Sequence, residues 1–99
     1  MDDSTTRLVR IANMEHLFDE VSRVLSEMDR SLDAFEGIKP KIETLSEYLD
    51  GGQWKEDFEA DEKGEIPASL KRGVLSEDGL YDLLTEVGRI SGRMKELLP

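Results

Sequence analysis

The chain contains no cysteine, one histidine and one tryptophan, and aromatic residues make up only 6% of its 99 residues. Without cysteine there is no disulfide framework, thiolate nucleophile, zinc-thiolate site or iron-sulfur cluster, so a small fold must be held together by packing. Hydrophobic runs are short, and none approaches the roughly 18 apolar residues of a membrane-spanning helix. The first residues lack the positive charge and apolar run of a signal peptide, so we expect a cytoplasmic protein.

Positive charge is also scarce. Thirteen Lys and Arg stand against 23 Asp and Glu, which gives a formal net charge of −10. This balance argues against binding to nucleic-acid phosphates and against docking on an anionic membrane surface. The length allows one small domain, residues 1–99, and excludes a two-domain enzyme.

The strongest pattern present is a long helical repeat. Apolar residues recur at alternating gaps of three and four, as at the a and d positions of a coiled coil, and predict a helix over residues 5–36. The members of this seam are Ile11, Met14, Phe18, Val21, Leu25, Met28, Leu32 and Phe35. Leu17 and Val24 flank the seam and widen it, which indicates that two helices lie against it.

Gly37 and Pro40 interrupt this repeat. Glycine favours a helix end, and proline removes a hydrogen-bond donor and disfavours helical geometry in the residue before it. The sequence therefore favours a turn here, followed by a second helix over residues 40–50. Because Ile42 and Leu49 nearly keep the phase of the seam, one long kinked helix is the alternative.

Two more helices are expected beyond Gly51 and Gly52. A short acidic helix over residues 53–63 places Trp54 and Phe58 four apart on one face. After an ordered connection, a helix over residues 77–98, capped by Ser76, again shows apolar gaps of three and four.

No strand-like alternation of useful length is present, so the chain is predicted to be all-α. We expect a long coiled-coil-like first helix packed in an antiparallel three-helix bundle or hairpin. The expected core consists of Phe18, Val21, Leu25, Leu32, Leu45, Leu49, Leu83, Val87 and Ile90. A first helix longer than either returning helix leaves part of its seam uncovered, which predicts self-association or a partner helix.

A basic island in the connection gives the first candidate partner-binding site. The candidate patch comprises Trp54, Phe58, Lys71 and Arg72. An aromatic anchor beside a guanidinium is typical of a binding hot spot. The competing, structural interpretation is that Arg72 folds back onto an acid such as Asp57 or Asp61 and fixes the connection, with Val74-Leu75 as its apolar anchor.

The last helix supplies the second candidate. Gly88 and Gly92 are four residues apart, off the apolar seam, and each interior glycine costs roughly 0.5 to 1 kcal/mol relative to alanine. One interpretation is that the two glycines form a shallow groove where another helix approaches closely. The other is that they are merely tolerated in a marginally stable outer helix.

Chemistry-bearing patterns are absent from the sequence. His16 lies off the seam without a supporting ligand or base at a suitable spacing. The acidic stretch 59–66 resembles part of a calcium loop, but Lys63 and Leu70 occupy positions that require oxygen ligands. We therefore predict no enzyme, no cofactor, and no catalytic or metal-binding residue.

Four segments of the chain form a recognisable series: Gly37-Ile38-Lys39-Pro40-Lys41-Ile42, Trp54 to Glu62, Leu70 to Asp78, and Tyr81-Asp82-Leu83-Leu84. In these segments, and over nearly its full length, the chain resembles an uncharacterised bacterial family known as domain of unknown function 4298. The resemblance implies a small bacterial cytoplasmic protein and brings no activity, cofactor or catalytic residue with it.

The sequence thus favours a non-enzymatic protein-protein interaction or adaptor module, with self-association or another protein as partner and no nucleic-acid or membrane ligand. The alternative is an acidic inhibitor that mimics nucleic acid and binds a nucleic-acid-binding protein. Salt separates the two, because charge-driven binding weakens steeply with ionic strength and apolar helix packing does not.

Overall fold

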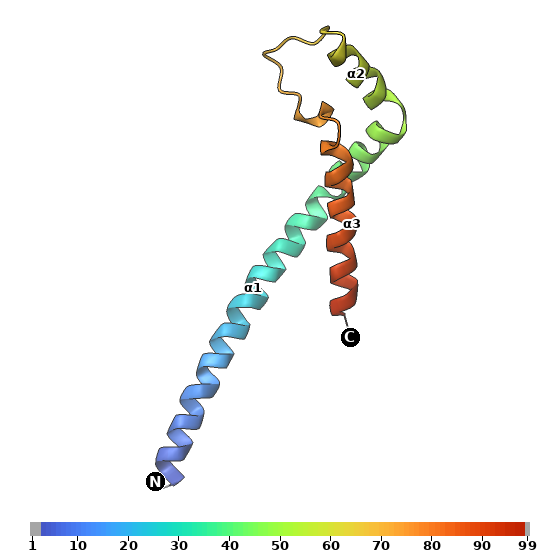
Figure 1. Cartoon of the computed structure of the whole chain (residues 1–99). Coiled ribbons are helices and arrows are strands. Elements are labelled where there is room, and N and C mark those ends of the chain that lie inside the picture. The colour runs from blue at the N-terminus through green and yellow to red at the C-terminus, as the bar shows by residue number, and fades with distance from the viewer. Residues whose placement is uncertain (1–2, 99) are drawn as a thin grey trace. The chain divides into compact units, whose positions relative to one another are not determined.

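The computed structural model describes residues 3–98, which contain three α-helices, one short 3-10 helix and no strand (Figure 1). In chain order these are α1 (Asp3–Asp50), α2 (Gln53–Glu62), η1 (Gly73–Leu75) and α3 (Gly79–Leu97). The predicted all-α fold with a long first helix is confirmed. None of these helices is long and apolar enough to cross a membrane.

The turn favoured at Gly37 to Pro40 is absent, and the expected helices over 5–36 and 40–50 are one helix, α1, with Pro40 inside it. An interior proline costs a helix about 3 kcal/mol. The apolar repeat offsets this cost, since Phe35, Ile42 and Leu49 follow one another at intervals of seven and are each partly buried. The Thr44 hydroxyl also donates a hydrogen bond to the Pro40 carbonyl, at 3.0 Å.

The chain divides into two compact units between Ile38 and Lys39. The N-terminal unit is a single helical segment of α1. Every described residue of it is exposed except Phe35, which is partly buried. The expected core positions Phe18, Val21, Leu25 and Leu32 are therefore wrong for this chain, because a single helix offers no second element within its unit to pack on.

The C-terminal unit contains the last turns of α1 together with α2, η1 and α3. Its core is small: among the described residues only Leu75 and Leu80 are fully buried, with 7% and 3% of their surface exposed. Leu75 belongs to η1, which packs against both α2 and α3. Among the expected core residues of this unit, Leu45, Leu49, Val87 and Ile90 are partly buried, whereas Leu83 is 51% exposed.

Glycines form the two tight reversals of the C-terminal unit. Gly52, with φ of 92°, joins α1 to α2, and Gly64, with φ of 76°, ends α2. At the end of α2, the Gly64 amide donates a hydrogen bond to the Asp61 carbonyl and the Glu65 amide donates one to the Ala60 carbonyl, both at 3.0 Å. These paired bonds satisfy the last carbonyls of α2 and direct the chain into the connection.

The start of α3 differs from the sequence expectation. The helix begins at Gly79, and Ser76 does not cap it, because the Ser76 hydroxyl bonds instead to the Gly73 carbonyl at 2.9 Å. Gly79 lies against this pair of residues. A Cβ atom at position 79 would lie 3.2 Å from the Gly73 carbonyl oxygen and in steric conflict with the Ser76 hydroxyl.

This close approach predicts opposite effects of one substitution at two glycines of α3. Gly88→Ala should raise the free energy of unfolding by about 0.5 to 1 kcal/mol, because a Cβ there meets nothing within 4 Å. Gly79→Ala should be at least about 1 kcal/mol less favourable than Gly88→Ala, because it displaces the Ser76 hydrogen bond. Urea unfolding measures both, and equal gains would contradict the packing described at Gly79.

Candidate functional site

The aromatic pair predicted on α2 is formed. Trp54 and Phe58 stack with ring centroids 5.0 Å apart and an angle of 17° between the rings. The indole Nε1–H of Trp54 donates a hydrogen bond to the Val74 carbonyl at 2.8 Å. Both rings are partly buried. Trp54 therefore joins α2 to η1, and its polar atom is already engaged within the chain.

Arg72 folds back onto α2, as the structural interpretation of the basic island predicted. Its Nη1 donates to Asp61 Oδ1 at 2.8 Å and to the Ile66 carbonyl at 3.2 Å. The side chains of Arg72 and Asp61 keep 37% and 25% of their surface exposed, so this ion pair is partly shielded from water. One guanidinium thus holds the end of the 63–72 segment close to α2 and to the Ile66 carbonyl within the same segment.

A side-chain hydrogen bond also joins the last turns of α1 to α2. The Tyr48 hydroxyl donates to Asp57 Oδ2 at 2.5 Å. Burial, with smaller contributions from the hydrogen bond and the negative charge of Asp57, raises the pKa of Tyr48 from 10.0 to about 12. Sequence reasoning missed this pair, because a spacing of nine across two glycines carries no recognisable signal.

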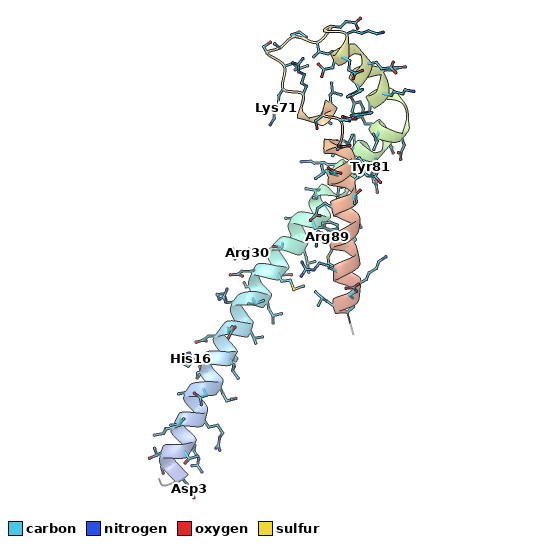
Figure 2. All side chains as sticks on the ribbon, in the orientation of Figure 1. Asp3, His16, Arg30, Lys71, Tyr81 and Arg89 are labelled. Atoms are coloured by element: carbon cyan, nitrogen blue, oxygen red, sulfur yellow. The ribbon has the colours of Figure 1, made fainter. Side chains whose placement is uncertain are left out.

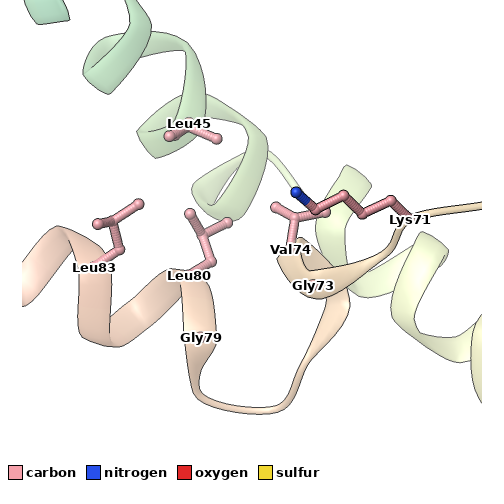
Figure 3. Close-up of a pocket in the computed structure, with 7 residues that line it drawn as sticks. All are labelled: Leu45, Lys71, Gly73, Val74, Gly79, Leu80 and Leu83. Carbon is pink, nitrogen blue, oxygen red and sulfur yellow. The ribbon is translucent and has the colours of Figure 1, made fainter.

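Next to these contacts lies an apolar groove of about 500 Å³ (Figure 3). It is lined by Leu45, Lys71, Gly73, Val74, Gly79, Leu80 and Leu83. The Lys71 side chain extends over Val74, as Figure 3 shows, and makes no ion pair with any residue of the 3–98 range. The sequence had pointed to Lys71 and to the Val74-Leu75 anchor, but not to the groove between them and α3.

The six candidate partner-binding residues are therefore distributed over four places. Trp54 and Phe58 stack on α2, Arg72 is bonded to Asp61, and Lys71 lines the groove. Gly88 and Gly92 lie on α3 and do not line it. A Cβ atom at either glycine would meet nothing within 4 Å, so no close helix approach occurs there within the described part of the C-terminal unit.

The N-terminal unit presents a second, larger apolar surface, which we call the α1 stripe. Its residues are Ile11, Met14, Leu17, Phe18, Val21, Val24, Leu25, Met28 and Leu32. Each of them has between 44% and 68% of its surface exposed. Figure 2 shows His16 and Arg30 together on one side of the helix, as expected for polar residues two heptads apart.

Groups that could support chemistry are sparse in the part of the chain that the structure covers. No three His, Asp or Glu side chains there gather closely enough to hold a metal ion. His16 is exposed, and no buried side-chain polar atom in the same range lacks a hydrogen-bond partner. The contact surfaces that residues 3–98 present at the groove and along the stripe are apolar.

These features define a class of small all-α proteins in which a long heptad-patterned helix leads into a hydrogen-bonded helical unit. Within that class the chain belongs to the family described as domain of unknown function DUF4298, whose match covers residues 11–97. The resemblance seen in the sequence is thereby confirmed. No curated protein and no solved structure matches the chain.

The position of Arg72 predicts a stability difference between two neighbouring basic residues. Arg72→Ala should lower the free energy of unfolding by about 1 kcal/mol, because it removes two hydrogen bonds from a partly exposed site. Lys71→Ala, which removes no bond within residues 3–98, should change it by less than about 0.5 kcal/mol. Urea unfolding of both variants checks this, and an equal loss would show that Arg72 does not fix the connection.

The raised pKa of Tyr48 predicts a stability change in alkali. The native hydroxyl keeps its proton up to about pH 12, whereas an unfolded tyrosine loses it near pH 10.0. The stabilisation is therefore fully present below pH 10.0 and is lost as the pH rises through about 12. Urea unfolding of the wild type and Tyr48→Phe checks this: their difference should be constant below pH 10.0 and shrink above it. A constant difference at every pH would contradict the raised pKa of Tyr48.

Proposed function

We propose that this protein is a non-enzymatic protein-protein interaction module and that the α1 stripe is its docking surface. The observation that carries the proposal is the exposure of nine large apolar side chains on one helix, at coiled-coil spacing. Soluble monomers rarely expose a contiguous apolar patch of more than a few hundred Å², and larger patches mark interaction sites.

Helix stability supports the same conclusion. Most helical stability in proteins comes from packing of an apolar face, not from the intrinsic propensity of the residues. The N-terminal unit has no fully buried residue among those described, and yet it is helical from Asp3 onward. A bound partner supplies the missing packing.

Acidic side chains along one flank of the stripe favour a second candidate, the acidic inhibitor of a nucleic-acid-binding protein. The flank carries Glu15, Asp19, Asp29, Asp33 and Glu36. These acids occupy the b and e positions of the heptad, where residues 3–38 contain no Lys or Arg. Arg23 lies on another face of the helix and pairs with Glu27 at 3.1 Å. Salt dependence separates this candidate from apolar docking.

The test is co-purification of proteins with the tagged full chain from its host, at low and high salt, using a matched pair of variants. Leu25→Glu puts a charge on the stripe, whereas Ser26→Glu adds the same charge one residue away, off the stripe. We expect a partner, which can be an untagged copy of the chain, to survive high salt with the wild type and Ser26→Glu. Leu25→Glu should reduce its recovery at least about tenfold, because a buried unpaired charge is costly.

Retention that is equal for the two variants would show that the stripe is not the docking surface. Retention of a nucleic-acid-binding protein at low salt alone would overturn the proposal in favour of the acidic inhibitor.

A further inference from the structure

We propose that the occupant of the α1 stripe is a second copy of this chain, aligned parallel to the first in a two-stranded coiled coil. This inference rests on the proposed function and names its partner. Three observations support it: the length of the stripe, the period of its apolar residues, and the charges on its two flanks.

The stripe is too long for the other long helix of the chain to cover. The helical segment of α1 up to Ile38 contains 36 described residues and is about 54 Å long at 1.5 Å per residue. Helix α3 contains 19 residues, about 28 Å. Whatever the placement of the two units, α3 leaves about half of this segment without a helical partner. The α1 helix of a second copy has the same length and can cover the whole segment.

The period of the stripe favours a helix over a flat protein surface. Gaps of three and four alternate without interruption from Ile11 to Phe35, an average of 3.5 residues per turn. On a straight helix of 3.6 residues per turn such a stripe drifts by about 20° per heptad. A second helix that winds around the first in a left-handed supercoil follows that drift and keeps all the layers in contact.

Flank charges favour the parallel arrangement. The seam places Glu15, Asp29 and Glu36 at e positions, while the g positions are occupied by Arg10, Leu17, Val24, Ser31 and Ile38. An antiparallel pair sets e positions against e positions, so carboxylates would face carboxylates. A parallel pair sets g against e of the second copy, which joins Arg10 to Glu15 and places no like charges opposite each other.

The contact area is sufficient for a specific interface. Nine exposed apolar side chains from each copy, at about 70 Å² apiece, bury on the order of 1,200 Å² in total, the lower limit of stable protein interfaces.

The affinity of the two copies for each other should depend on salt in an unusual direction. Each chain carries a net charge of −10, so added salt screens repulsion between the copies and strengthens their association.

Sedimentation equilibrium of the purified full chain tests the association. We expect a dimer whose dissociation constant falls as salt is raised to about 1 M, where the Debye length is about 3 Å. Met14→Glu should weaken the dimer about 10- to 100-fold, and its neighbour Asn13→Glu, with the same charge off the stripe, by less than about threefold. A monomer at every concentration, or equal weakening by both variants, would overturn the proposal.

Orientation is tested by single cysteines, which the chain otherwise lacks. In a parallel dimer, Met14→Cys and Met28→Cys each bring two identical d positions together, and both should form interchain disulfides under mild oxidation. His16→Cys, on the outer face, should remain unlinked. An antiparallel dimer can join at most one of the two d positions to its own copy, so linkage at one alone contradicts the parallel arrangement.

The two proposals fail in different ways. If the purified chain is monomeric while Leu25→Glu still abolishes salt-resistant co-purification of a different protein, the second copy is excluded and the interaction module stands. If co-purification is insensitive to Leu25→Glu and the purified chain is monomeric, both are excluded.

Discussion

A lone α-helix has no second surface against which its own apolar stripe can be buried, and this constraint governs the N-terminal unit. The nine residues of the α1 stripe remain at least 44% exposed, although seven of them have the spacing of a packed seam. The hydrophobic effect therefore acts on this unit mainly through whatever docks on it. Fold and function are coupled here, because the partner that is recognised also supplies the packing that the helix lacks.

The C-terminal unit has a small core and is held together in part by side-chain hydrogen bonds. Only Leu75 and Leu80 are fully buried in the described part of this unit, and three side-chain hydrogen bonds tie its segments together around them. Tyr48 joins α1 to α2, Trp54 joins α2 to η1, and Arg72 joins the connection to α2. Each of these directional bonds joins two different segments of the unit, so together they specify one arrangement of short elements that hydrophobic burial alone would leave variable.

Sequence patterns predicted the helical fold, because periods of three and four and the glycines at positions 51, 52 and 64 act locally. They predicted that Arg72 folds back onto an acid such as Asp57 or Asp61, since opposite charges lie near each other along the chain, and in the structure the acid is Asp61. They favoured a turn at Gly37 to Pro40 and gave one continuous helix only as the alternative, because the cost of a proline competes with an apolar register that extends over many turns. They also missed the groove beside Lys71 and the Tyr48-Asp57 bond, which depend on how separate elements meet in space.

The structure places the candidate binding residues in different surroundings. Trp54 and Arg72, chosen as a recognition patch, are engaged inside the chain, whereas Lys71 borders an open apolar groove. Gly88 and Gly92 stay candidates for contact with another helix, because the space above them is open.

The single tryptophan gives the protein an optical probe of one unit only. Its indole is bonded to η1 and stacked on Phe58, so its emission depends on whether the connection is seated on α2. Circular dichroism, in contrast, reports both units, because the described α-helical residues are divided between them, 36 up to Ile38 and 41 from Lys39 onward. Melting curves recorded by the two signals therefore coincide if the units unfold together and differ if they unfold in separate steps.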